Sequence, residues 1–177
     1  MAKQVADGLA LPCEDEVADE YALAQGSLKE LGYEQYEVSN FARKGSACRH
    51  NWNIWRGEDY WGFGVGAVGT VEGVRHSHGD DLQEYIRLVA GGASPVLHRE
   101  TLTPSIRAWE KLMLGLRTRE GVLKEEVDRV AAARRFSQGE KFHRLLQEGF
   151  LSLSDGRYRV ASKGYFVMNG ILETLVA

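Results

Sequence analysis

The residues that could recognise a ligand gather in one stretch of the sequence, residues 48–71. Three of the four tryptophans of the 177-residue chain lie here, and glycine then occupies every second position at Gly62, Gly64 and Gly66. Aromatic rings offer large flat contact areas, and glycines in a strand often mark a close approach by a ligand or by another backbone. The stretch predicts either a binding surface for a flat, adenine-like molecule or a packed aromatic core beside a glycine-bent edge strand.

Two other pairs of side chains could do chemistry. Cys48 and His50 could act as a thiolate nucleophile and its base, because on a strand residues two apart share a face, but nothing in the sequence orients the base. His76 and His78 could ligate a metal on one face of a strand, but no third ligand follows at a recognisable spacing. Two exposed loop histidines are the favoured interpretation, and no catalytic residue or metal ligand is assigned.

The elements that must position the stretch 48–71 alternate in type. The predicted elements are a helix over 14–31, a strand over 33–41, a glycine-interrupted strand over 59–71 and a helix over 82–89. A helix, a glycine and then a strand is the repeating unit of a parallel α/β sheet. Because ligands bind beyond the carboxyl ends of such strands, Ser39, Asn40 and the loop after them occupy the place of a site.

Prolines mark a change of architecture near residue 95. Pro95 and Pro104 bound the segment that best fits a domain boundary, so residues 1–95 and 96–177 are predicted as two domains. The elements predicted for the second domain are helices from Pro104 after the cap Thr103, over 123–134 and over 137–147, a hairpin over 150–160 and a helix over 162–176. This order is typical of a mostly helical, winged-helix-like module.

The composition is that of a soluble globular protein, with 44% hydrophobic and 27% charged residues and a net charge of −3. No apolar run reaches the roughly 18 residues of a membrane span, and no secretory signal is evident. Two cysteines are too few for a disulfide scaffold, and reduced thiols fit a cytoplasmic protein. We therefore expect a cytoplasmic protein with no membrane partner.

Two segments carry a family resemblance. Tyr36–Ala42 (YEVSNFA) and Arg49–Ala67 (RHNWNIWRGEDYWGFGVGA) resemble the late part of the oxygen-independent coproporphyrinogen-III oxidase-like radical SAM family, with the HemW haem-chaperone branch as the nearest. The resemblance continues through Gly115–Val122 (GLRTREGV) to the C-terminus. It implies an α/β fold, in which the end of a partial parallel (β/α) barrel is followed by the winged-helix-like accessory domain.

The family's defining cysteines are missing from this sequence. Members hold a [4Fe–4S] cluster with a CxxxCxxC motif and leave one iron open for S-adenosylmethionine, whereas the chain has only Cys13 and Cys48. We therefore expect the C-terminal part of a longer protein, with no radical chemistry of its own. The resemblance implies that the cluster and S-adenosylmethionine belong to the intact parent, and that the missing N-terminal barrel part is a partner.

The resemblance also implies site residues. The expected lining of the S-adenosylmethionine site is Gly64, Gly66, Ala67 and Val68, and the polar signature positions expected to bind substrate are Asn40, His50 and Asn51. The substrate or cargo would be a porphyrinogen or haem. Position 68 is often histidine in the haem-chaperone branch and aliphatic in oxidase-like relatives, so the valine here speaks against a histidine-dependent role at this position. The choice between oxidase and chaperone stays open because the discriminating parts of the family lie upstream.

Two non-catalytic alternatives remain. Cys48 and His50 could ligate haem, which would make the chain a haem-binding or haem-delivery module. The helix over 137–147 could instead be a DNA recognition helix in the major groove, with Arg157 and Arg159 of the hairpin contacting phosphates. The basic footprint is weaker than that of most DNA-binding domains, so a nucleic-acid partner is not favoured.

Overall fold

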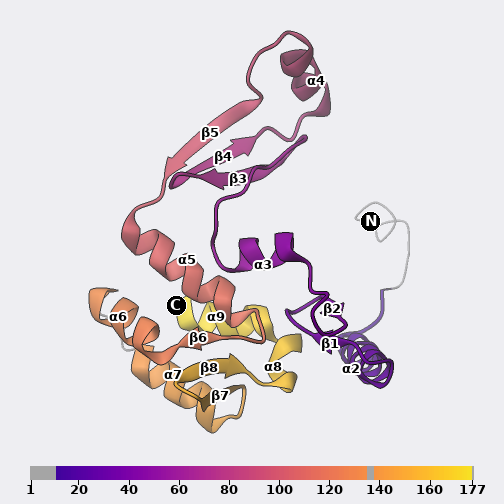
Figure 1. The fold of residues 1–177 in the computed structure, drawn as a ribbon, viewed down its shortest axis with the longest axis vertical. Helices are drawn as coiled ribbons and strands as arrows, with labels where there is room; N and C mark the ends of the chain where they lie inside the picture. Colours follow the sequence, from indigo (N-terminus) through magenta and orange to yellow (C-terminus); the bar gives the residue numbers. More distant parts are fainter. Residues whose placement is uncertain (1–10, 135–137, 177) are drawn as a thin grey trace.

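The computed structural model describes residues 11–134 and 138–176. Figure 1 shows three regions. The body, residues 102–176, holds the hydrophobic core, and the arm, residues 58–101, extends away from it. The N-terminal segment, residues 11–57, lies beside the body.

Helix α5 (Pro104–Leu116) begins at the predicted cap and joins the arm to the body. The Thr103 hydroxyl accepts the backbone N–H of Ile106 at 3.2 Å, and Pro104 takes the first helical position, where its missing N–H costs nothing. The buried residues of the helix are Trp109, Leu112 and Leu116, which share one face. The predicted start of this helix is confirmed.

The rest of the body wraps this helix with further helices and a small sheet. The elements are β6 (Val122–Leu123), α6 (Lys124–Arg134), α7 (Gln138–Gln147), β7 (Leu151–Ser154), β8 (Arg157–Val160), α8 (Ser162–Phe166) and α9 (Met168–Val176). The strands are antiparallel in the order β6-β8-β7. Asp155 and Gly156 both have positive φ angles, as the Asp-Gly hairpin turn requires, so the predicted hairpin is confirmed.

Two predictions for the body, a single last helix and a capping box, do not correspond to the structure as described. The single helix predicted over 162–176 is wrong, because the chain leaves the helical conformation at Val167 and starts again at Met168. The predicted capping box beginning at Ser137 lies outside the described residues.

One hydrophobic core fills the body. Its buried members come from α5, α6, α7, β6, β7, β8 and α9, and the fully buried side chains include Leu116, Phe142 and Leu175. The rings of Phe142 and Tyr158 lie 4.7 Å apart between centroids. The buried members of this cluster begin at Trp109, and Val38 of the N-terminal segment packs against it, while Tyr36 is also buried.

The arm is a three-stranded antiparallel sheet with one helix. Strands β3 (Val68–Val71), β4 (Val74–His78) and β5 (Val96–Thr101) pair in that order, and α4 (Leu82–Ala90) lies at the tip between β4 and β5. The sequence offers Asp80 or Asp81 as the cap of α4, and Asp81 takes this place by accepting the N–H of Glu84 at 2.9 Å. All of residues 58–101 are described, and Gly69 is the only buried one among them.

The N-terminal segment contains two helices and a minimal hairpin. Its elements are α2 (Glu14–Glu30), β1 (Glu34–Gln35), β2 (Phe41–Ala42) and α3 (Arg49–Trp55). Helix α2 was expected and has no buried residue. No helix among the described residues combines the length and apolar character needed to span a bilayer.

The predicted mixed α/β character is confirmed, but the strands predicted for the N-terminal half differ from those in the structure. The strand predicted over 33–41 is wrong: the Tyr36 N–H donates to the Asn40 carbonyl at 3.1 Å, and the turn so closed pairs β1 with β2 antiparallel. The strand predicted over 59–71 shortens to β3, preceded by irregular backbone. Every strand pair named among the described residues is antiparallel, so the expected parallel pairing is not found. The division at residue 95 stays a prediction.

Candidate functional site

The glycine-rich stretch folds back across strand β3. Tyr60 and Thr70 exchange two backbone hydrogen bonds of 2.8 and 2.9 Å, which brings residues 60–62 over residues 68–70. A Cβ atom on Gly62 would lie 2.3 Å from the Val68 carbonyl oxygen, and one on Gly69 would lie 2.6 Å from the Gly62 nitrogen. These two glycines are therefore needed for the close approach of two backbone segments.

Gly64 and Gly66 have a different reason to be glycine. Both have positive φ angles, of 104° and 67°, and a Cβ on either would meet no atom within 4 Å. Two contacts with the end of strand β4 and the residue after it hold the turn that they form. The Gly66 N–H donates to the Gly79 carbonyl at 2.7 Å, and His78 Nδ1 lies 2.6 Å from the Gly64 carbonyl oxygen. The turn is thus held in place while its backbone stays open to an approaching molecule.

Ala67 and Val68 continue the same turn into the edge strand. The Ala67 carbonyl accepts the His78 N–H at 2.9 Å, and Val68 pairs with Ser77 while its side chain stays exposed. The structure therefore places the four residues expected to line a cofactor site in one continuous turn.

Exposed apolar side chains lie in this turn and elsewhere on the arm. We use the term apolar surface of the arm for the exposed apolar residues Trp61, Phe63, Val65, Val68, Leu82, Ile86, Val89 and Leu97. Phe63 is 85% exposed and Trp61 64%, and the Trp61 ring stacks on that of His76 at 6.2 Å between centroids. Trp61 and Phe63 thus do not pack in a core, whereas Trp52, Trp55 and Tyr60 are partly buried and the Trp52 ring contacts that of the buried Tyr36 at 5.7 Å between centroids.

Asn40 and Asn51 lie in a second place, around the turn of residues 36–40. Glu37 is 1% exposed, and its Oε1 accepts hydrogen bonds from the Asn40 side-chain amide and, at 3.2 Å, from the Ser39 N–H. The Asn51 amide donates to the Tyr36 hydroxyl at 3.4 Å. Asn40 therefore satisfies a buried carboxylate, which is a structural role that sequence reasoning did not foresee.

His50 and Cys48 lie at the start of helix α3. Cys48 is the N-cap residue and His50 is in the first turn, and both are exposed. The expectation of a shared face on a strand is wrong, since residues two apart on a helix point about 200° from each other. No hydrogen bond orients His50 among the described residues, so the thiolate–base pair has no support.

The two groups of expected site residues are not joined to each other. Residues 64–68 belong to the arm, whereas Asn40, His50 and Asn51 belong to the N-terminal segment. Across the described parts of the chain, no hydrogen bond or ion pair connects the two groups.

The histidines of the arm serve the sheet rather than a metal. His76 and His78 lie on strand β4, not in the expected loop, and their rings contact Trp61 and Tyr85 respectively. Within residues 11–134 and 138–176, no group of three or more His, Cys, Asp or Glu side chains could hold a metal ion.

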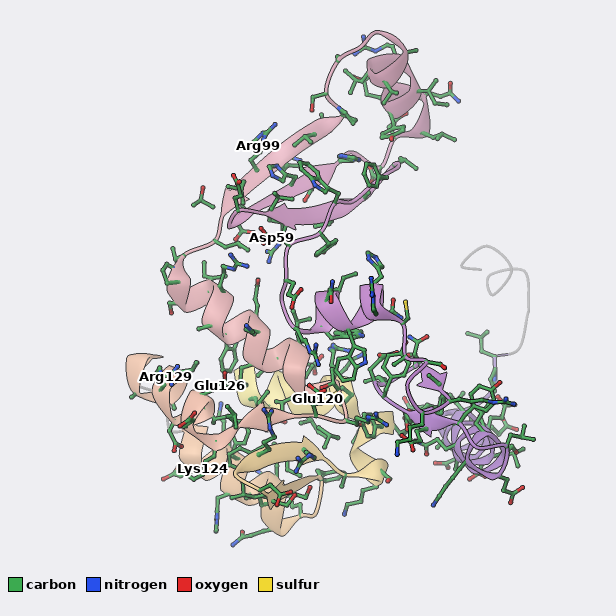
Figure 2. The ribbon with its side chains drawn as sticks, in the orientation of Figure 1. Asp59, Arg99, Glu120, Lys124, Glu126 and Arg129 are labelled. Atoms are coloured by element: carbon green, nitrogen blue, oxygen red, sulfur yellow. The ribbon has the colours of Figure 1, made fainter. Side chains whose placement is uncertain are left out.

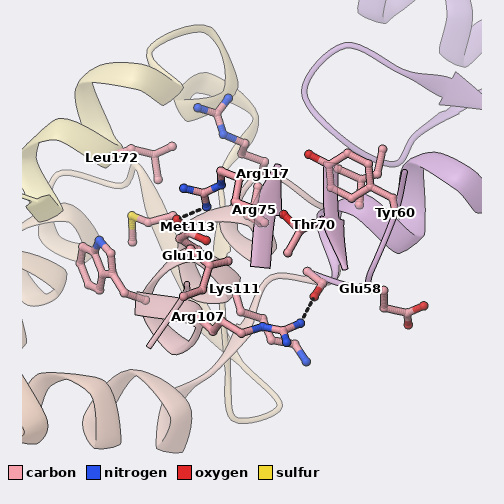
Figure 3. Close-up of a pocket in the computed structure, with 15 residues that line it drawn as sticks. Glu58, Tyr60, Thr70, Arg75, Arg107, Glu110, Lys111, Met113, Arg117 and Leu172 are labelled. Carbon is pink, nitrogen blue, oxygen red and sulfur yellow. Dashed lines mark hydrogen bonds and ion pairs between the residues drawn. The ribbon is translucent and has the colours of Figure 1, made fainter. Parts of the chain in front are cut away.

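Sequence reasoning missed one concave site. A cavity of about 490 Å³ lies between the arm and helix α5, and no expected site residue lines it (Figure 3). Its lining comes from residues 54–60, 70–75, 102–117 and 172, which are far apart in the sequence. The sequence signal was on α5, where the cations Arg107 and Lys111 and the apolar Leu114 are spaced by four and three residues and so lie on one side of the helix.

Comparison with known proteins now assigns the family. Residues 102–167 match the HemN C-terminal domain. The chain is 31% identical over 166 residues to the heme chaperone HemW of Lactococcus lactis, covering 93% of this chain and 43% of that protein. It is 32% identical over 177 residues to the heme chaperone HemW of Mycobacterium tuberculosis, covering 99% of this chain and 44% of that protein.

The chain matches the C-terminal part of the HemN- and HemW-like radical SAM family. The fold agrees with that of coproporphyrinogen III oxidase (HemN) from Escherichia coli, described as a radical SAM enzyme. The TM-score is 0.69 at 14% identity, over 93% of this chain and 42% of that one. The chain thus spans less than half the length of the curated relatives it matches.

Proposed function

We propose that this chain acts as the C-terminal portion of an oxygen-independent coproporphyrinogen-III oxidase-like radical SAM protein of porphyrin or haem metabolism. In this role the body is the winged-helix-like accessory domain, and the arm and N-terminal segment complete the barrel formed by the rest of the protein. The observation that carries the proposal is the arm, which is ordered but has no core of its own.

A sheet and helix without a core need a covering partner. Ordering each residue costs about 1–2 kcal/mol of backbone entropy, and buried apolar surface, which normally offsets that cost, is nearly absent from residues 58–101. Monomeric proteins rarely leave large contiguous apolar patches uncovered. The relatives named above have more than half of their length outside the match, and that unmatched part is the proposed cover.

The turn of residues 64–68 is the proposed wall for S-adenosylmethionine. Its Cβ-free backbone is open at Gly64 and Gly66, and the exposed ring of Phe63 offers a flat apolar contact for adenine. The residues present therefore fit one side of such a ligand. When bound in the parent, S-adenosylmethionine would supply the reactive group, and these residues would position it and exclude water.

The chain does not fit the iron–sulfur cluster of the family. Its two cysteines, Cys13 and Cys48, are exposed and cannot supply the three thiolates that the cluster needs. We therefore propose that the chain alone is not a radical enzyme. The expected result is no release of 5′-deoxyadenosine from S-adenosylmethionine by the isolated chain under reducing conditions with iron and sulfide.

The polar side of the proposed site is Asn40, His50 and Asn51, with porphyrinogen or haem as the ligand. Of these, His50 is exposed in the first turn of α3, where it could ligate iron; Cys48 is the N-cap of the same helix and does not share a helix face with His50. Asn51 and Asn40 order the turn of residues 36–40 behind this helix. The role in haem binding therefore rests first on His50.

Haem titration tests this assignment. We expect the chain to give a saturable Soret shift that is lost or weakened at least about tenfold in His50→Ala or Cys48→Ala, the difference expected for losing one good ligand contact. His98→Ala is the matched control, since His98 is also exposed but lies on β5 of the arm. Equal titrations of wild type and all three variants would contradict a haem site at α3.

A nucleic-acid role for the body has weaker support. The order of helices and strands in the body agrees with a winged-helix-like domain, but the candidate cations are already engaged. Arg144 pairs with Glu148 at 2.8 Å, and Arg159 donates to the Ser154 carbonyl and hydroxyl. Binding to random duplex DNA whose affinity falls steeply with salt concentration would support this alternative.

A further inference from the structure

We propose that the cavity between the arm and helix α5 binds a small organic anion with an apolar body, and that Lys111 holds its acidic group. This proposal does not depend on the function proposed above, because none of the residues assigned there lines the cavity. The volume of about 490 Å³ falls within the range of small-molecule sites.

The cavity has walls from all three regions of the molecule. Tyr60, Thr70 and Arg75 belong to the arm, the α5 residues and Leu172 of α9 belong to the body, and Ile54 and Gly57 belong to the N-terminal segment. Figure 3 shows Tyr60 and Thr70 on one side of the space, with Met113 and Leu172 on the other. A bound molecule would therefore contact the arm and the body at once.

The floor of the cavity is apolar. The hydrophobic lining consists of Ile54, Leu102, Trp109, Met113, Leu114 and Leu172. Leu102, Trp109 and Leu172 are otherwise buried in the structure, so this surface is fixed by the fold rather than by loose side chains. An apolar ring or chain on the ligand would be removed from water here, which stabilises binding by about 25 cal/mol per Å².

The charged residues of the lining are Arg75, Arg107, Lys111, Arg117, Glu58 and Glu110. Arg75 and Arg107 also pair with Glu100 and Asp59 outside the lining. Lys111 and Arg117 are therefore the two cations of the lining without a carboxylate partner among the described residues, and an acidic group of a ligand would be favoured beside them. The apolar floor would contact the organic part of such a ligand.

The three arginines are held by protein groups. Arg75 lies between Glu110 at 2.5 Å and Glu100 at 2.7 Å, and the bond to Glu110 raises its pKa. Arg107 donates to the Gly57 carbonyl at 3.3 Å and pairs with Asp59, the residue that Figure 2 shows at the foot of the arm. These contacts fix two walls of the cavity and leave little of either charge for a ligand.

Lys111 differs from the arginines. Among the described residues it makes no hydrogen bond or ion pair, and its stem packs along Gly57, where a Cβ would lie 3.6 Å from Lys111 Cγ. Arg117 is intermediate: it donates to the Asn169 side-chain oxygen at 3.2 Å and lies over the Trp55 ring. The Lys111 ammonium therefore has all three donors unused among the described residues, whereas Arg117, the C-cap residue of α5, uses one of its five donors on Asn169. Lys111 is the first candidate to hold the acidic group, and Arg117 is the second.

A matched pair of fluorescent probes tests the proposal. 8-Anilinonaphthalene-1-sulfonate carries one sulfonate on an apolar ring system, and N-phenyl-1-naphthylamine has the same rings without the charge. Each is titrated into the full 177-residue chain and into Lys111→Gln, with Lys44→Gln as control. Lys44 is also an exposed lysine without a partner among the described residues, but it lies in the loop before α3.

We expect the sulfonate probe to bind wild type and Lys44→Gln alike and Lys111→Gln about 5- to 20-fold more weakly, the loss typical of one charge-assisted contact. The neutral probe should bind all three proteins equally. In a ¹⁵N–¹H correlation spectrum, the amides of Gly57, Thr70 and Leu114 should shift on addition of the sulfonate probe. Equal affinity in Lys111→Gln, or shifts confined to the apolar surface of the arm, would overturn the proposal.

Discussion

At the scale of single residues, two glycines of the body separate backbone strain from helix propensity. Gly121 has a φ of 64°, and a Cβ there would lie 2.0 Å from the Tyr158 carbonyl oxygen. Gly170 lies on the exposed side of α9, where a Cβ meets nothing within 4 Å. The same substitution should therefore have opposite effects at the two positions.

We expect Gly121→Ala to lower the free energy of unfolding by about 2–4 kcal/mol, since it adds both a left-handed alanine and a backbone clash. Gly170→Ala should raise it by about 0.5–1 kcal/mol, the helix-propensity gain of alanine over glycine. Urea denaturation followed by circular dichroism measures both. A Gly121→Ala variant as stable as wild type would show that strand β8 does not approach Gly121 this closely.

Tyr165 gives the body a dependence on alkaline pH. Burial, assisted by the nearby Tyr21 and Glu37, raises the pKa of Tyr165 from 10.0 to about 12. Between these two values the unfolded chain has released the phenolic proton and the folded chain has kept it. Stability contributed by this group is therefore fully present below pH 10 and is lost as pH rises through 12.

We expect the free energy of unfolding to fall by about 2 kcal/mol more in wild type than in Tyr165→Phe between pH 9.5 and 12. Subtracting the free energy of unfolding of Tyr165→Phe from that of wild type removes the contributions that the two proteins share from other groups titrating in this range, such as Tyr21. Parallel stability curves for the two proteins would mean that Tyr165 titrates as an exposed phenol.

At the scale of elements, stability should reside in the body and not in the arm. Leu116 in α5 is fully buried within the core, whereas Leu97 on β5 is 53% exposed. Leu116→Ala should cost about 2–5 kcal/mol because it leaves a cavity. Leu97→Ala should change stability by less than about 0.5 kcal/mol. A comparable loss in the free energy of unfolding for both variants, measured by urea denaturation, would mean that Leu97 is buried in an apolar core of the arm.

Elements specified by local chemistry could be predicted from the sequence. Thr103 with Pro104, Asp81 before α4, and Asp155-Gly156 each fix a boundary through their own side chains or φ angles, and all three were found as expected. The strand over 33–41 failed because alternation alone does not show that residues 36–40 close a turn around Glu37.

The candidate site was less predictable than the elements. Residues 64–68 form one turn because they are contiguous, so their grouping was visible in the sequence. Helix α3 was not foreseen, since its tryptophans and asparagines carry no clear helical period. The cavity beside α5 was missed because Tyr60, Arg75, Lys111 and Leu172 meet only through tertiary packing.

At the scale of the whole molecule, the chain is a well-packed body carrying an arm that lacks a core. The main buried cluster comes from residues 109–175, while the exposed apolar side chains of the arm face solvent. Local opening of the arm should therefore need far less free energy than global unfolding. The relatives offer a reason, since the chain matches only 43–44% of their length.

The central claim is that the unmatched N-terminal part of such a protein covers the arm. Hydrogen exchange tests it most directly, on the chain alone and on a fusion that places the N-terminal segment of the Lactococcus lactis relative before it. In the fusion we expect the amides of β3, β4 and α4 to exchange at least about tenfold more slowly, while amides of the body stay unchanged. Ile86→Glu, on the exposed face of α4, should abolish the gain. Equal exchange of the arm in the chain and in the fusion would contradict the account.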